Sequence, residues 1–196
     1  MDKQMQNKAV FLDRDGVINP LVYNTDAKEY ESPHSPEDFS LYPFVLKSLQ
    51  TLKANNFKII IVSNQPSFAK GKTAMENLKS IEKLFEDFSI ENGRLIDDFY
   101  YCYHHPKGII PEYSCICNCR KPGILFPQKS VKKYNLAINQ CFFVGDCDID
   151  IECGQKMGFK TIKINNKRSA NKSLTSHPDK TVENLYEAVL EILKYQ

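Results

Sequence analysis

The sequence lacks the features that would place the protein in a membrane, outside the cell or on nucleic acid. No apolar run approaches the roughly 18 residues of a membrane span, and the first ten residues lack the apolar core of a secretory signal. Lysine and arginine number 26 against 24 aspartates and glutamates, so the net charge is only +2. Internal repeats and low-complexity tracts are also absent. These absences predict a cytoplasmic protein with no membrane and no nucleic-acid partner.

What is present suits one globular domain. The 196 residues are 42% hydrophobic and 11% aromatic, which is enough to bury a core within a single domain over residues 1–196. Seven cysteines occur, and four of them lie between positions 102 and 119. Because the number is odd and no export signal is visible, metal binding is favoured over disulfides.

Short apolar runs alternate with amphipathic stretches along the chain. The runs are rich in Val, Ile, Phe and Tyr, and predict strands at 9–12, 58–62, 98–103, 141–144 and 161–164. Helices are predicted at 43–55, 73–88, 149–157 and 182–195, and polar loops at 19–42, 103–123 and 165–180. The alternation predicts an α/β protein with a Rossmann-like three-layer α/β/α parallel sheet. Such sheets carry their chemistry at the carboxyl ends of the strands.

Two aspartates follow the first predicted strand, in the sequence Asp13-Arg14-Asp15-Gly16. Carboxylates two positions apart at a strand end can face one site, where they can ligate Mg²⁺ or serve as nucleophile and general acid/base. Gly16 allows a tight turn beside a ligand. A polar turn that merely ends the strand explains this motif, taken alone, equally well.

Polar residues follow later strands in the same way. Ser63 and Asn64 come directly after 58–62, where they can donate to a phosphate or form a cap or turn. Asp146 follows the strand at 141–144 and is placed to bind a metal, and Asp150 either supports it or caps the next helix. Lys121 follows the cysteine-rich segment, where a lone lysine is ordinarily a solvated charge.

The cysteine-rich segment offers a set of zinc ligands. A C-x-H pair at 102–104 precedes the sequence Cys115-Ile116-Cys117-Asn118-Cys119, so a tetrahedral Cys3His site is available. The second pair of ligands is either Cys115 with Cys117 or Cys117 with Cys119, and spacing alone does not decide between them. Unliganded thiols are the alternative. Two ligand pairs would staple the 103–123 loop, which has no apolar core of its own.

In order along the chain, these motifs resemble those of the haloacid dehalogenase superfamily of phosphatases, over nearly the whole sequence. The resemblance implies that Asp13 is the nucleophile and that Asp15 protonates the leaving alcohol and then activates water. It further implies that Ser63 binds the phosphoryl group and that Lys121 balances its charge. It implies a Mg²⁺ site made of Asp13, the backbone carbonyl of Asp15 and Asp146, supported by Asp150.

The cysteine segment resembles that of the D,D-heptose 1,7-bisphosphate phosphatases and the related histidinol-phosphate phosphatases, which have a shorter loop. The shared elements are C-x-H-H-P, twelve residues between the first histidine and the next ligand, and C-x-C-R-K-P. This resemblance implies the zinc ligands Cys102, His104, Cys117 and Cys119. Cys115 is then a spare thiol and His105 lies outside the set. The stapled loop would carry Arg120 and Lys121 to the active site in place of a large cap domain.

The resemblance therefore implies a Mg²⁺-dependent phosphatase with structural Zn²⁺ that removes the 7-phosphate of D-glycero-D-manno-heptose 1,7-bisphosphate, in the biosynthesis of nucleotide-activated heptose for lipopolysaccharide or surface glycans. Asn19, Asn64 and Arg120 would contact this small sugar phosphate, and we expect a monomer. Hydrolysis of histidinol phosphate in histidine biosynthesis is the alternative within the superfamily. A non-enzymatic zinc-loop binding module is the alternative of another class.

The sequence departs from the family pattern in three places. Pro66 and Ser67 replace the usual Ser-Gly, Cys147 stands where a lysine often follows the aspartate, and the loop at 19–42 is longer and contains His34. All three lie where the non-transferred part of a substrate would bind, so they bear on substrate identity rather than on the chemistry.

Overall fold

The computed structural model describes residues 6–169 and 175–195. Its centre is a sheet of six parallel strands in the order β5-β4-β1-β6-β7-β8. The strands are β1 (Asn7–Leu12), β4 (Phe57–Asn64), β5 (Asp98–Cys102), β6 (Leu136–Gly145), β7 (Lys160–Ile164) and β8 (Lys180–Val182). The predicted parallel α/β sheet is confirmed.

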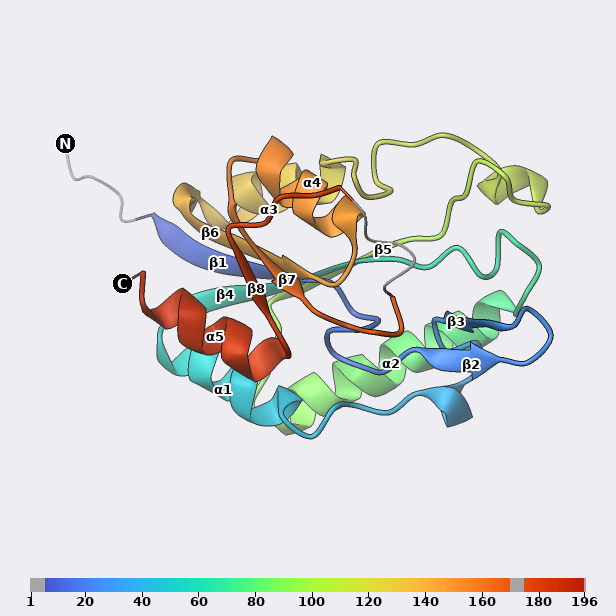
Figure 1. Ribbon diagram of the computed structural model, residues 1–196, viewed down its shortest axis with the longest axis horizontal. Helices are drawn as coiled ribbons and strands as arrows, with labels where there is room; N and C mark the ends of the chain where they lie inside the picture. Colours follow the sequence, from blue (N-terminus) through green and yellow to red (C-terminus); the bar gives the residue numbers. More distant parts are fainter. Residues whose placement is uncertain (1–5, 170–174, 196) are drawn as a thin grey trace.

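Helices cover both faces of the sheet and make the three layers seen in Figure 1. The helices α1 (Val45–Ala54), α2 (Met75–Glu91) and α5 (Leu185–Leu193) pack on one face. The helices α3 (Leu125–Tyr134) and α4 (Asp148–Lys156) pack on the other. Successive side chains of β1 serve the two cores in turn, because strand residues alternate between faces. Val10 and Leu12 join the first core, and Phe11 joins the second.

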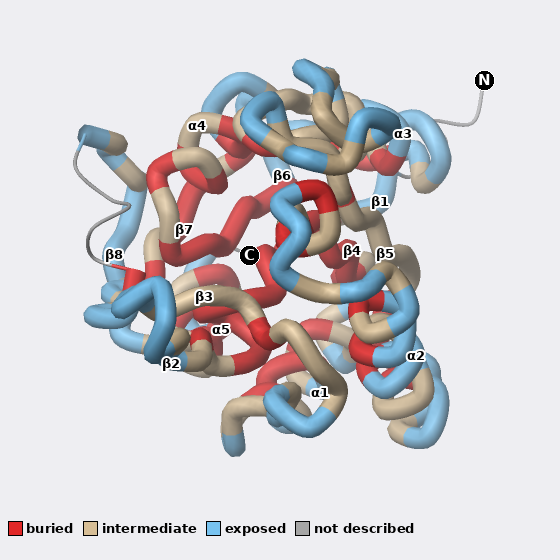
Figure 2. The backbone as a smooth tube through the Cα atoms, turned by 90° about the vertical axis from the view of Figure 1, so that its right-hand side faces the viewer, coloured by how far each residue is buried: buried red, intermediate tan, exposed pale blue. Residues whose placement is uncertain are grey.

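The central strands of the sheet are buried because they are apolar on both faces. Residues 9–12 of β1 and 59–61 of β4 have no exposed surface, as expected for parallel strands covered by helices on both sides. Figure 2 shows this buried centre surrounded by exposed loops. No helix within the described residues is long and apolar enough to cross a membrane.

Several short elements differ from those predicted. Helix α3 was not predicted, and α1 begins at Val45 rather than at Pro43. The polar tripeptide of β8 forms an edge strand where the sequence predicted a loop and the start of a helix. The 19–42 loop contains a small antiparallel hairpin, β2 (Val22–Asn24) with β3 (Glu29–Glu31), and a 3₁₀ turn, η1 (Pro36–Asp38).

The segments that follow the strands gather at one end of the molecule. The β2–β3 hairpin and the 103–123 segment, with its 3₁₀ turn η2 (Pro111–Tyr113), both lie beyond the carboxyl ends of the strands (Figure 1). Within the described residues, no large helical cap stands over this end. The chain leaves β1 for β4 on one side and reaches β6 on the other, so the strand order reverses beside β1. Ligand sites of open parallel sheets form at such a reversal.

Candidate active site

Asp13 lies at the end of β1, at the reversal of strand order. Its backbone N–H donates to the carbonyl of Val144 in β6 (3.0 Å), which extends the sheet pairing by one residue. Its carboxylate is 2.7 Å from the Nζ of Lys121. Two neighbouring strands and a buried cation therefore fix the position of this carboxylate.

Lys121 is a buried cation between two carboxylates. Its Nζ lies 2.7 Å from Asp13 Oδ1 and 2.7 Å from Asp150 Oδ1, and the side chain is 1% exposed. Burial works against its charge, but the two carboxylates outweigh burial and raise the pKa of Lys121. The solvated surface charge is therefore excluded for this lysine.

The amide of Asn64 holds the backbone of Lys121. Its Nδ2 donates to the Lys121 carbonyl (3.1 Å), and its Oδ1 accepts from the Lys121 N–H (3.0 Å). A bond on each side of the amide ties the end of β4 to the segment that follows the cysteines. Asn64 was expected to contact substrate, and in this structure its amide positions Lys121.

Asp150 combines the two roles between which the sequence did not decide. Its Oδ2 accepts from the backbone N–H of Cys147 (3.0 Å) at the start of α4, and its Oδ1 pairs with Lys121. Burial, opposed by Lys121, raises the pKa of Asp150 to about 7. Gly145 makes room for it, since a Cβ there would lie 2.2 Å from the Asp150 Cβ.

Asp146 follows β6 and is 3% exposed. Burial first, and then the charge of Asp13, raise its pKa to about 6. Gly16 lies against it with φ of +87°, and a Cβ at that position would come within 1.9 Å of Asp146 Oδ2. Asn166, after β7, donates to the same oxygen at 3.1 Å. Crowded carboxylates that resist ionisation are expected at a site that takes a cation.

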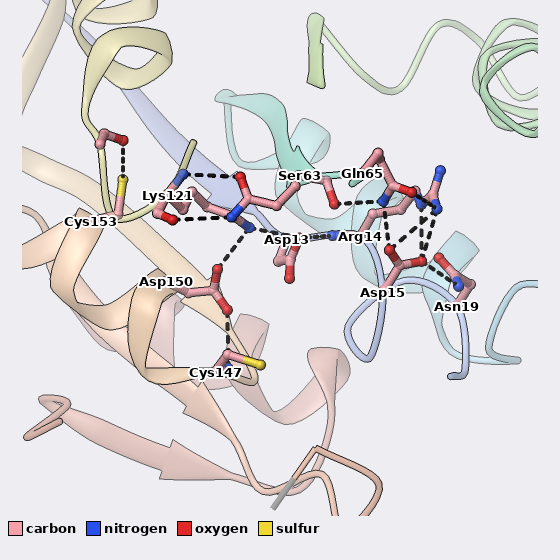
Figure 3. A network of polar contacts seen from close by, with 12 residues as sticks. Asp13, Arg14, Asp15, Asn19, Ser63, Gln65, Lys121, Cys147, Asp150 and Cys153 are labelled. Atoms are coloured by element: carbon pink, nitrogen blue, oxygen red, sulfur yellow. Dashed lines mark hydrogen bonds and ion pairs between the residues drawn. The ribbon is translucent and has the colours of Figure 1, made fainter. Parts of the chain in front are cut away.

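Asp15 lies on the other side of Asp13, well apart from the Lys121–Asp150 pair, as Figure 3 shows. Its carboxylate accepts from the Arg14 guanidinium (3.0 and 3.1 Å), Asn19 Nδ2 (2.9 Å) and Gln65 Nε2 (2.6 Å). Burial alone would raise its pKa, but the charge of Arg14 and these hydrogen bonds hold the pKa of Asp15 below its usual value. Asn19, expected to contact substrate, is fully buried and bonds Asp15 instead.

Six of the predicted site residues line one cavity of about 200 Å³, whereas Asn19, Ser63 and Asp150 lie outside its lining. Its lining includes Asp13, Asp15, Asn64, Arg120, Lys121 and Asp146. Pro66 and Cys147, where the sequence departs from the family pattern, line it as well. Arg120 donates to the carbonyl of His104 (3.3 Å), which ties this part of the wall to the cysteine cluster.

Cys102, His104, Cys117 and Cys119 form the second cluster. Their ligand atoms all lie within 4.8 Å of one another, and the shortest separation is 3.1 Å, between the sulfurs of Cys117 and Cys119. Thiolates about 2.3 Å from a tetrahedral Zn²⁺ would be ~3.8 Å apart, so these side chains fit that ion after a small outward shift. Cys115 is exposed outside the cluster. The structure therefore favours the second of the two possible ligand pairs.

Three polar residues of the site, Arg14, Gln65 and Asn166, had no role predicted from the sequence. Gln65 belonged to the Ser63-Asn64-Gln65 motif, and Arg14 stood between the two aspartates, so both were adjacent to predicted residues. Asn166 had no such signal, because it reaches Asp146 across 20 positions of sequence. Only the fold brings it to the site.

The fold and the carboxylates at its strand ends define a class of protein, the HAD-like hydrolases. The family model described as HAD-hydrolase-like matches residues 118–188. The solved D,D-heptose 1,7-bisphosphate phosphatase from B. bronchiseptica, complexed with magnesium and phosphate, superposes with a TM-score of 0.76 at 22% identity. The alignment covers 96% of this chain and 99% of that one, so the two share the fold.

Curated relatives narrow the class to a family. The D-glycero-alpha-D-manno-heptose-1,7-bisphosphate 7-phosphatase of Photorhabdus laumondii is 34% identical over 151 residues, which cover 77% of this chain and 78% of the relative. The D-glycero-D-manno-heptose-1,7-bisphosphate 7-phosphatase of Chlorobaculum tepidum is 30% identical over 190 residues, which cover 93% and 92%. The chain belongs to the family of heptose-1,7-bisphosphate 7-phosphatases.

Proposed function

We propose that this protein hydrolyses the 7-phosphate of D-glycero-D-manno-heptose 1,7-bisphosphate, with Asp13 as the nucleophile. The observation that carries the proposal is the convergence of Asp13, Lys121 and Asp146 on one cavity. Family membership supports the substrate, because the relatives compared above are named for this reaction. Relatives named for the alpha and for the beta anomer both match the chain, so the test includes both anomers.

The residues present fit a Mg²⁺ ion. Asp13, the backbone carbonyl of Asp15 and Asp146 would hold it, and Asp150 would support them through Lys121. Burial and the charge of Asp13 raise the pKa of Asp146, and a cation held between the two carboxylates would offset both effects. The absent Cβ of Gly16 leaves room beside the Asp146 oxygen. When bound, Mg²⁺ would neutralise charge on the transferring phosphoryl group.

The chain's own residues divide the work in two steps. In the first, an oxygen of Asp13 attacks phosphorus, the bond from phosphorus to O7 breaks, and Asp15 gives its proton to O7. In the second, Asp15 takes a proton from water, which attacks the aspartyl-phosphate and releases phosphate with a free Asp13 carboxylate. The low pKa of Asp15 suits the second step. Its proton for the first can arrive with the substrate, since a phosphate monoester has a second pKa near 6.

Lys121 and Ser63 would stabilise the phosphoryl group during transfer. Lys121 presents a fixed positive charge beside Asp13, and positioned charge is the main contribution a protein makes to this chemistry. Ser63 is the penultimate residue of β4 and is 1% exposed. Its hydroxyl accepts from Gln65 Nε2 (3.0 Å), so its own proton is available to donate.

A structural Zn²⁺ would be bound by Cys102, His104, Cys117 and Cys119. The cluster joins the end of β5 to the segment that leads directly into Arg120 and Lys121. Closing the loop there limits the freedom of both cations without a cap domain. We propose that Arg120, on the cavity wall, contacts the non-transferred part of the substrate.

Phosphate release with Mg²⁺ tests the proposal. The substrates are the two anomers of heptose 1,7-bisphosphate, histidinol phosphate and other sugar phosphates. Asp13→Asn should abolish release from every substrate. The control is Asp87→Asn, at a partly exposed position on α2, which removes the same charge and should leave activity intact. Full activity of Asp13→Asn would overturn the mechanism, and preference for histidinol phosphate would overturn the substrate. A monomeric state and a cytoplasmic location stay predictions.

A further inference from the structure

Arg14 is the largest fully buried side chain in the described part of the protein, and its charge serves Asp15. Its guanidinium carbon lies 5.8 Å from the ring centroid of Phe39 and 5.8 Å from that of Tyr101. It donates to Asp15 Oδ1 through Nε (3.1 Å) and Nη2 (3.0 Å) and to Gln65 Oε1 through Nη2 (2.8 Å). A buried arginine that lies near two aromatic rings and donates through Nε and Nη2 to two side chains is restricted in its motion, although its buried Nη1 has no hydrogen-bond partner among the described residues.

Gln65 connects Asp15 to Ser63. Its Nε2 donates to Asp15 Oδ2 (2.6 Å) and to Ser63 Oγ (3.0 Å), as Figure 3 shows. Its backbone N–H donates to the carbonyl of Cys102 (2.7 Å), which is one of the four cluster residues. Gln65 is fully buried, so no water competes for these bonds.

The charges on either side fix the orientation of the Gln65 amide. Arg14 can only donate, so it must face the amide oxygen, and an ionised Asp15 can only accept, so it must face the amide nitrogen. The second N–H of that nitrogen then points at Ser63 Oγ and occupies it as an acceptor. The Ser63 hydroxyl is left to donate its proton elsewhere, toward an incoming phosphoryl oxygen.

From this geometry we infer that Arg14 and Gln65 are positioning residues, which hold Asp15 and Ser63 in one hydrogen-bonded relay that couples phosphoryl binding to proton transfer. The inference rests on the proposed function, in which Asp15 donates to the leaving alcohol. Without the relay, Asp15 keeps Asn19 as a partner but loses the fixed angle at which its proton must be delivered.

Two substrates with different leaving groups distinguish positioning of Asp15 for proton donation from a merely structural role. An alkyl leaving group, as in heptose 1,7-bisphosphate, needs a proton in the transition state, whereas p-nitrophenyl phosphate releases a stable phenolate with little need of one. The ratio of kcat/KM for the two substrates therefore measures proton donation in the first step alone. Hydrolysis of the aspartyl-phosphate follows that step and does not enter the ratio.

The variants are Arg14→Met and Gln65→Met, which preserve apolar volume and remove the hydrogen bonds. Each should lower the alkyl-to-aryl ratio of kcat/KM by about 10- to 100-fold, a part of the 10²- to 10⁴-fold that general acid catalysis supplies. Arg14→Lys should recover part of the ratio, because one donor to Asp15 remains. Gln140→Met, at an exposed position in the amino-terminal half of β6, should not change it.

Asp15→Asn shows how far the ratio falls when the acid itself is lost. It also distinguishes failure of the proposed function from failure of the positioning role. If Asp15→Asn leaves the ratio unchanged, the acid role in the proposed function is wrong. If Asp15→Asn lowers the ratio but neither Arg14→Met nor Gln65→Met does, the proposed function stands and the positioning role is refuted. Equal losses with both substrates would likewise refute it. Thermal unfolding of each variant identifies one that fails to fold, and the other variant then decides the question.

Discussion

The pKa of Asp146 predicts how the stability of the protein depends on pH and on Mg²⁺. This carboxyl group has a pKa of about 6 in the folded chain, against about 3.9 in an unfolded one. The folded state therefore binds more protons between these values, and its stability must fall as the pH rises through them. Well above the folded-state pKa of about 6, the contribution of Asp146 to stability is lost completely.

The size of the effect follows from the two pKa values. At pH 5 the proton favours the folded form of Asp146 about tenfold, which is about 1.4 kcal/mol of stability, and at pH 8 this contribution has vanished. Other groups titrate in the same range, among them Asp150 with its pKa of about 7. Asp146→Asn removes the ionisable group with little change of shape, so the difference between wild type and variant isolates Asp146.

The measurement is urea unfolding of both proteins at pH 5 and pH 8. Dialysis should remove Mg²⁺, and a chelator must be avoided because it would also take Zn²⁺ from the cysteine cluster. Wild type should lose about 1.4 kcal/mol more than Asp146→Asn between the two pH values. Equal pH dependence in the two proteins would refute the assignment of this carboxyl as a crowded, proton-binding group.

Adding Mg²⁺ should reverse the effect in wild type. The ion would bind the ionised carboxylate, so at pH 8 it should stabilise the folded chain by about 2.7 kcal/mol when its concentration is 100 times the dissociation constant, and by less at pH 5. Asp146→Asn should gain little at either pH. A Mg²⁺ effect that is equal in the variant would place the ion elsewhere.

The remaining predictions concern the cysteine cluster, the turn after β1 and the half-buried Asp97, which pairs with two lysines. Cys119→Ser should lower both the zinc content and the melting temperature, by about 2–4 °C for each kcal/mol of stability lost, whereas Cys115→Ser should retain one zinc in elemental analysis. Gly16→Ala should raise the Mg²⁺ concentration for half-maximal activity at least about tenfold, since ligand geometry governs affinity; Gly93→Ala, at φ of +89° with nothing within 4 Å, controls for backbone strain alone. Asp97→Asn should cost about 2 kcal/mol at pH 7. Burial opposes its ionisation, but two lysines and a backbone N–H hold the pKa of Asp97 low, so the loss should shrink as urea unfolding is repeated below about pH 4.

Strands and site residues could be predicted from the sequence where a residue type is compatible with only one kind of environment. Apolar runs such as 58–62 are unsuited to any exposed position, so the strands could be predicted, and an aspartate directly after such a run must lie at the carboxyl edge. Asp13 and Asp146 were predicted on that ground, and the structure places both on the cavity. Metal binding by the cysteine-rich segment was predicted because cysteine is rarely so dense without a ligand, and the family resemblance then implied the four cluster residues.

Half-buried and edge elements escaped prediction because their sequences carry little apolar signal. Helix α3 has only Pro127 and Ser130 fully buried, so no apolar stripe marks it. Strand β8 is three residues long and pairs with β7 alone, and its lysine and threonine are exposed. Tertiary contact, rather than local preference, decides such segments.

Side-chain partners in the site could not be read from sequence for a different reason. Asn19 and Asn64 were expected to contact the substrate; their amides bond Asp15 and the backbone of Lys121, and Asn64 also lines the cavity. An amide satisfies a buried charge and a ligand equally well, and only the geometry of its neighbours decides which it serves. The role of Arg14 was not predicted either, because its partner, Asp15, lies at the next position of the chain, where sequence spacing indicates no contact.

The charges gathered around Lys121 explain why chemistry and metal belong together in this fold. Three carboxylates, Asp13, Asp146 and Asp150, lie around a single ammonium group, and burial first, and then the neighbouring carboxylates, raise the pKa values of Asp146 and Asp150. A phosphate dianion would be repelled from such a site. One bound divalent cation would offset this negative charge, and the ammonium group of Lys121 would then attract the phosphoryl group rather than compensate the protein's own acids. Arg120, one residue away, extends the positive wall of the cavity toward the rest of the substrate. The acidic strand ends would therefore hold the metal, and the segment that carries the proposed zinc ligands would supply the two cations, Lys121 and Arg120, that bind phosphate.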